Sequence, residues 1–338
     1  MMDKIIRESI DNLLLEEFGI IYGLEPLCQY ILEQFFTIML HECFKGNSYY
    51  EIEFEQPIYM KDIKNEISCK NWYGLDRLNK IILKTVVNSY NEASVNFEDD
   101  DDEHSTPIIV ININRGFTKR ELYEKVSKFG EQKVFNIFVS TYEPSIMHEL
   151  THLIEIVRTG NNYKYPAYAY MDDDEYEDQQ AMGQVRRASF AFSKTEMNAR
   201  VTTIYYQILN DKNLINQIRM WNGKRGDLCK RLISLTSNFN WINDIKKYLF
   251  IVRRAAEKGD RPDVDFVKNF IKINKFAAFS GSKNLFKLRW NENDDGEVED
   301  VSKVVWSLYD KMYKMYYTYL QKLYKATNLA IEEVINKR

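Results

Sequence analysis

The segment HELTH, residues 148–152, holds the residues of this sequence best suited to bind a metal ion. His148 and His152 are four residues apart and so lie on one face of an α-helix, where both imidazoles can reach the same ion. Glu149 between them can take a proton from a water molecule that the metal activates. Zn²⁺ suits this HExxH motif, and the alternative is two histidines on a polar helix face without metal.

A third ligand is expected from a carboxylate, because no histidine follows His152 and position 158, where one group of zinc enzymes has a third histidine, is an arginine. Glu155 shares the face of the two histidines. It lies seven residues after His148, which is roughly 10 Å along a helix. We therefore expect Glu155 to hold an imidazole or a basic neighbour rather than the ion.

Glu196 is the better candidate for the third ligand. It lies near the start of another predicted helix, after a connection long enough to let that helix pack across the first. Arg200, one turn later, could orient the carboxylate of Glu196. A second possible role for Glu196 is to complete a capping box with Ser193. The acids of residues 172–178 are weaker candidates, since they belong to a polar run without helical pattern.

The HExxH motif, the acid at Glu155 and the later Glu196-x-x-x-Arg200 resemble the gluzincin metallopeptidases over residues 108–210. The resemblance implies a zinc-dependent peptidase that acts on a peptide or protein substrate, with Glu149 as the general base. The alternative is a structural or virion-associated protein that keeps a zincin scaffold with a structural zinc ion. A structural site does not need Glu149, so its presence favours the enzyme.

The resemblance also implies a mixed sheet above the motif helix, with an edge strand that aligns extended substrate. Residues 108–114 and 133–140 are the two candidates for that strand. Sites of this kind often add a tyrosine or histidine that stabilises the oxyanion, and Tyr168 is our choice. The connection that follows the motif offers three further tyrosines, Tyr163, Tyr165 and Tyr170.

Apolar spacing predicts the elements that position these residues. Helices are expected at residues 3–17, 25–44, 74–90, 118–129, 143–158, 193–209 and 301–336, and Pro144 is expected in the first turn of its helix. Strands are expected at 49–59, where Pro57 stops the strand, at 108–114 and at 285–290. Residues 133–140 fit a strand or the start of the next helix.

These elements predict an α+β protein: a zincin-like core with a small mixed sheet over the HExxH helix, extended by mostly helical N- and C-terminal regions. The expected regions are 1–95 (helices and a strand), 96–210 (the core) and 211–338 (helical).

Charge and composition restrict the partners. With 46 basic and 50 acidic residues the net charge is −4, and the scattered basic residues argue against nucleic acid. The sequence has neither a membrane-spanning run nor a signal peptide, so we expect no membrane partner and a cytoplasmic location. Abundant Ile, Asn, Lys and Tyr indicate an AT-rich, phage-like genome, which keeps a virion-associated location open. The sequence does not fix an oligomeric state.

Overall fold

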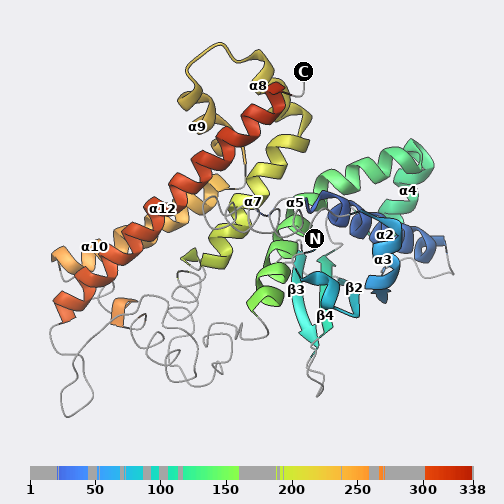
Figure 1. The fold of residues 1–338 in the computed structure, drawn as a ribbon, viewed down its shortest axis with the longest axis horizontal. Coiled ribbons are helices and arrows are strands. Elements are labelled where there is room, and N and C mark those ends of the chain that lie inside the picture. The colour runs from blue at the N-terminus through green and yellow to red at the C-terminus, as the bar shows by residue number, and fades with distance from the viewer. Residues whose placement is uncertain are drawn as a thin grey trace, which may run out of the picture. The chain divides into compact units, whose positions relative to one another are not determined.

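The computed structural model describes fourteen helices and strands of the chain, numbered in chain order, and most of them are labelled in Figure 1. The described residues are 21, 23–44, 52, 54–68, 72, 74–86, 93–98, 106–112, 117–159, 188, 191, 192, 194–236, 238–258, 266–268, 270 and 301–336. The predicted helix at 3–17 and the predicted strand at 285–290 lie outside these residues. The fold is α+β, as predicted.

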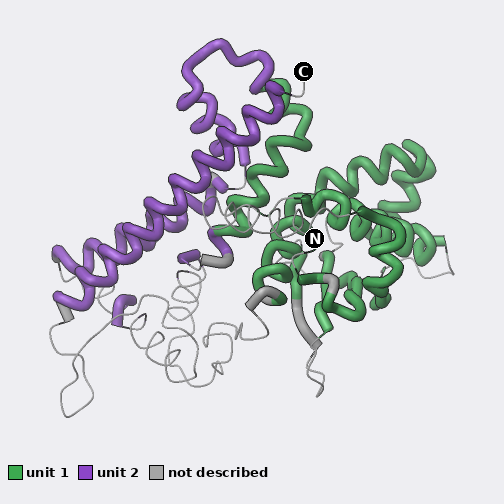
Figure 2. The backbone as a smooth tube through the Cα atoms, viewed as in Figure 1, with its two compact units in different colours: residues 1–162, 198–217, 337–338 green, residues 163–197, 218–336 purple. Residues whose placement is uncertain are grey.

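The chain divides into two compact units (Figure 2). Unit 1 comprises residues 1–162, 198–217 and 337–338, and unit 2 comprises residues 163–197 and 218–336. The three regions proposed from the sequence stay a prediction.

Unit 1 contains the small mixed sheet that the sequence predicted. Its strands are β1 (Glu55–Tyr59), β2 (Lys80–Val86), β3 (Ala93–Glu98) and β4 (Thr106–Asn112), in the order β1-β2-β4-β3. The β2–β4 pair is parallel, whereas β1–β2 and β3–β4 are antiparallel. The predicted strand at 108–114 therefore exists as β4, but it lies inside the sheet and β3 forms the edge beside it.

Two predictions around the sheet are wrong. The described part of the predicted helix at 74–90, residues 74–86, is not a helix: a short 3-10 turn, η1 (Leu75–Arg77), is followed by β2. Strand β2 pairs with a neighbour on both sides, and its side chains at Ile81, Ile82 and Leu83 are buried. The apolar run is too short for its spacing to distinguish a helix from a strand, so pairing with the neighbouring strands determines its conformation. Pro57 does not stop the first strand but lies within β1, which is tolerated because β1 is an edge strand.

The motif helix is longer than predicted. Helix α5 runs from Glu131 to Thr159, so the segment 133–140 is helical and Pro144 lies inside the helix rather than in its first turn. A proline there removes one backbone hydrogen bond. Aromatic packing one turn upstream offsets that loss, since Phe138 contacts Tyr142 with ring centroids 4.9 Å apart and Phe117 at 5.3 Å. Neither segment proposed for the substrate-aligning edge strand therefore forms a sheet edge.

Two helices of unit 1 pack beside α5. Helices α2 and α4 pack against α5 and against each other, and α5 also lies against β3 and β4 (Figure 1). Helix α4 begins with a capping box in which Thr118 and Glu121 exchange hydrogen bonds. The predicted helices at 25–44, 118–129 and 193–209 are confirmed as α2 (Glu25–Phe44), α4 (Lys119–Phe129) and α7 (Lys194–Asn210); the short α3 (Met60–Glu66) was not predicted.

Unit 2 is helical in its described part. Helices α9 (Arg225–Leu235), α10 (Asn238–Lys258) and α12 (Val301–Asn336) pack on one another. Helix α8 (Lys212–Met220) begins in unit 1, and its last residues, from 218 on, belong to unit 2. The predicted closing helix at 301–336 is confirmed as α12, and its apolar stripe is largely buried, as at Leu308, Met312 and Leu323. Among the described helices, none is both long and apolar enough to cross a membrane.

Candidate metal centre

Two hydrogen bonds fix helix α7 against helix α5. The Asn198 side chain donates to Glu155 at 2.9 Å, and the Asn210 side chain donates to Glu143 at 2.9 Å. Glu143 and Glu155 are twelve residues apart, as are Asn198 and Asn210, so the two helices run antiparallel in register over about 18 Å. Gln29 of α2 also donates to Glu143, at 2.8 Å. The two hydrogen bonds between α7 and α5, called the frame below, determine where the first turn of α7 lies relative to α5.

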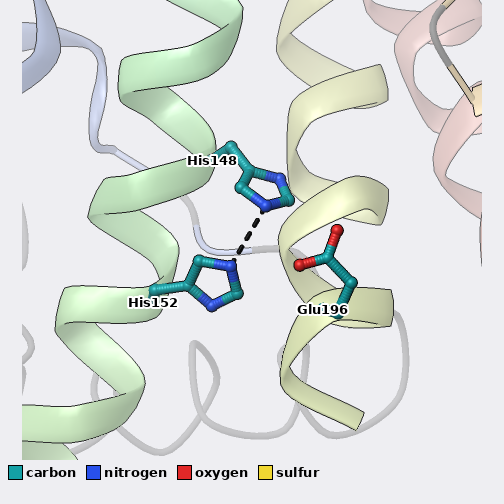
Figure 3. Close-up of side chains that lie close together, drawn as sticks. All are labelled: His148, His152 and Glu196. Carbon is teal, nitrogen blue, oxygen red and sulfur yellow. Dashed lines mark hydrogen bonds between the residues drawn. The ribbon is translucent and has the colours of Figure 1, made fainter. Parts of the chain in front are cut away.

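The frame brings the three predicted ligands together. His148 and His152 project from successive turns of α5, and Glu196 projects toward them from the first turn of α7 (Figure 3). One ligand atom of each side chain lies within 4.8 Å of the other two. These residues form a group that could hold a metal ion, and they were all named from the sequence.

The separation of the two imidazoles fits a shared ion. Their Nε2 atoms are 3.0 Å apart and the rings are nearly perpendicular, at 84°. Two nitrogens bound to one tetrahedral zinc ion at about 2.0 Å lie about 3.3 Å from each other. Without an ion, one Nε2 donates a hydrogen bond to the other, which sets the tautomers of the pair. Small rotations of the rings would exchange that hydrogen bond for a bound ion.

Glu196 is the most buried member of the group, with none of its surface exposed, whereas both histidines are half-buried. Taking a carboxylate out of water costs several kcal/mol unless positive charge or hydrogen bonds compensate it. A cation shared with two neutral imidazoles supplies such compensation. The chemistry of this donor set, two nitrogens and one carboxylate oxygen, is that of a zinc site with an open fourth position.

Glu149 connects the motif helix to the edge of the sheet. Its Oε2 accepts a hydrogen bond of 3.0 Å from the backbone N–H of Val95 in β3. Among the described strands β3 pairs with β4 alone, so every second backbone N–H of β3 points away from the sheet, and that of Val95 meets Glu149 of α5. No sequence motif indicates this contact, because the Val95 N–H reaches Glu149 only once the strand order places β3 at the edge of the described sheet.

The roles given to the other predicted residues stay predictions. Glu155 accepts its hydrogen bond from Asn198, a buried amide that the sequence analysis did not single out. Arg200 lies one turn after Glu196 on α7 and is half-buried, so it is on the helix where the prediction places it. Tyr168, chosen for the oxyanion, lies outside the described residues, as do Tyr163, Tyr165 and Tyr170.

Comparisons of this chain with protein families, with curated proteins and with solved structures found no match.

Burial makes Glu143 a source of pH-dependent stability. Desolvation raises the pKa of its carboxyl above the ordinary value of 4.5, while the hydrogen bonds from Asn210 and Gln29 partly oppose the rise. The folded state therefore binds more protons than the unfolded state just above pH 4.5, and the free energy of unfolding falls as pH rises through the folded pKa.

We expect Glu143→Gln to remove this fall, because the amide oxygen can still accept both hydrogen bonds and carries no charge. Urea unfolding at about pH 4 and about pH 7 should show the variant gaining stability over wild type as pH rises. Glu131→Gln, an exposed change in the same helix, should show no such gain; an equal gain in both variants would contradict the prediction.

Proposed function

We propose that this protein is a zinc-dependent peptidase of the gluzincin type, built on a zincin-like core. The observation that carries the proposal is the group of His148, His152 and Glu196, whose ligand atoms lie within 4.8 Å of one another on two packed helices. Glu149 supplies what a purely structural site does not need, a carboxylate between the two histidine ligands. The substrate class is a peptide or a protein.

The residues present fit Zn²⁺. His148 and His152 would bind through Nε2, and Glu196 would bind through one carboxylate oxygen. When bound, zinc polarises a carbonyl and makes a water molecule acidic enough to act near neutral pH. The hydrogen bond between Asn198 and Glu155 holds α7 on α5, and so it holds Glu196 in reach of the histidines.

Glu149 is the proposed general base. It follows His148 directly on the helix, so its carboxylate can take a proton from the attacking water and deliver it to the leaving amine. The hydrogen bond from Val95 holds that carboxylate beside the edge of the sheet. Strand β3 is also the edge strand that we propose for extended substrate, because it lies at the edge of the described sheet next to Glu149.

A second candidate function has one observation in its favour. The Val95 hydrogen bond gives Glu149 a structural use, because it ties α5 to the sheet edge. A non-catalytic protein with a zinc ion that stabilises the fold would keep this contact and the three ligands. Such a protein would bind zinc tightly and cleave nothing.

The two functions are separated by a test of peptide cleavage with zinc removal. Purified protein loaded with zinc is incubated with a complex mixture of peptides, and new termini are identified by mass spectrometry. We expect cleavage that stops on chelation and returns when zinc is added. A protein that holds one zinc ion but yields no new termini would reject the peptidase and favour the structural site.

A further inference from the structure

A cavity of about 570 Å³ lies wholly within unit 2, among helices α9, α10 and α12. Its volume is in the usual range for small-molecule sites. Its lining combines aromatic, apolar and basic side chains: Trp221, Lys230, Arg231, Ile233, Ser234, Ile242, Lys246, Tyr316, Leu320 and Tyr324. Among these described lining residues none is acidic.

One wall of the cavity is aromatic and apolar. Tyr316, Leu320 and Tyr324 are four residues apart on α12, so they form a single stripe that faces the cavity. Burial raises the pKa of both phenols above the ordinary value of 10, which keeps the hydroxyls protonated as hydrogen-bond donors. This wall suits a flat aromatic ring, which can pack against the rings of the two tyrosines.

Trp221 is held in a fixed position at the cavity. Its indole N–H donates to the Lys224 carbonyl at 3.2 Å. A side chain at Gly223 would meet the indole ring at 3.0 Å, so the glycine backbone packs closely on the ring. Because the ring is already held in place, little side-chain conformational entropy is lost when a ligand stacks on it.

The opposite side of the cavity is basic. Lys230 and Arg231 come from α9, and Lys246 comes from α10. Lys230 lies 4.0 Å from Asp227, but both side chains are largely exposed, so this ion pair is weak and leaves most of the positive charge at the cavity. Three cations without a lining carboxylate favour a ligand with negative charge.

We propose that this cavity binds a small aromatic anion, a molecule with one flat ring and a phosphate or carboxylate group. The ring lies against Tyr316, Tyr324 and Trp221, and the anionic group is bound by Lys246 and its basic neighbours on α9. The cavity shares no residue with the group of His148, His152 and Glu196.

The proposal is tested by calorimetry of the full chain at low ionic strength. We expect phenyl phosphate or benzoate to bind one to one, and inorganic phosphate and phenol each to bind at least about tenfold more weakly than the better ligand. Tighter binding of phenyl phosphate assigns the site to phosphate esters, and tighter binding of benzoate assigns it to carboxylates. Binding of neither aromatic anion overturns the proposal.

Two lysines adjacent on α10 supply a matched pair of variants. Lys246 lines the cavity and Lys247 does not, and both are exposed, so neither change should disturb the fold. Lys246→Gln should weaken binding about tenfold, whereas Lys247→Gln should change it less than about twofold. Equal losses in both variants would mean diffuse charge attraction and would overturn the site, as would binding that disappears when metal is chelated.

Discussion

Glu149→Gln is expected to lower peptide cleavage by about a hundredfold to ten-thousandfold while the bound zinc stays. The amide of glutamine has an oxygen that can still accept the Val95 hydrogen bond, so the contact between α5 and β3 is kept. The glutamine amide cannot take a proton from the attacking water, so the variant loses only the proposed general base. Cleavage rates on a peptide identified with wild type, together with elemental analysis for zinc, measure the two effects separately.

The matched control is Glu131→Gln, the same chemical change at an exposed position in the first turn of α5. It should leave both cleavage and zinc content at the wild-type level. If Glu149→Gln cleaves as fast as this control, then Glu149 is not the base, and its contact with Val95 accounts for its presence. If Glu149→Gln instead loses zinc, the carboxylate contributes to the metal site and the proposed ligand set is wrong.

Helix prediction succeeded where the apolar pattern was long and the boundary signals were local. Helix α12 has a stripe that repeats over 36 residues, and its bounds came out as predicted. Strand β2 was wrongly predicted as a helix because its seven residues are too few to show whether apolar side chains repeat with helical or strand spacing. Its conformation depends on pairing with β1 and β4, which are distant in sequence. Pro144 was misplaced for a similar reason, since the packing of Phe138 and Tyr142 against Phe117 maintains a helix through it.

The group that could hold a metal ion was predictable because helix geometry alone fixes two of its three residues. His148 and His152 share a face in any α-helix, so their approach to 3.0 Å needs no tertiary information. Glu196 could be proposed only from its helix and its distance along the chain. Its actual approach depends on Asn198 and Asn210, whose hydrogen bonds set the register of α7 on α5. Neither amide has a sequence signature that distinguishes it from other asparagines.

Glu196→Gln is expected to lower zinc affinity by more than about a hundredfold, since even residues outside the ligand set change affinity ten- to a hundredfold. Glutamine preserves the size of a side chain that is fully buried, so the variant tests the charge and the ligand oxygen rather than the packing. Removing a buried carboxylate also ends its desolvation cost, so the metal-free variant should be at least as stable as metal-free wild type.

Thermal unfolding with added zinc gives a readout that needs no substrate. An ion that binds only the folded state stabilises it by about 2.7 kcal/mol when its free concentration is a hundred times the dissociation constant. Wild type and Glu149→Gln should therefore melt at a higher temperature with zinc, and Glu196→Gln and His152→Ala should not. A zinc-dependent rise in Glu196→Gln equal to that of wild type would show that the third ligand is another residue, while the two histidines of α5 would remain the core of the site.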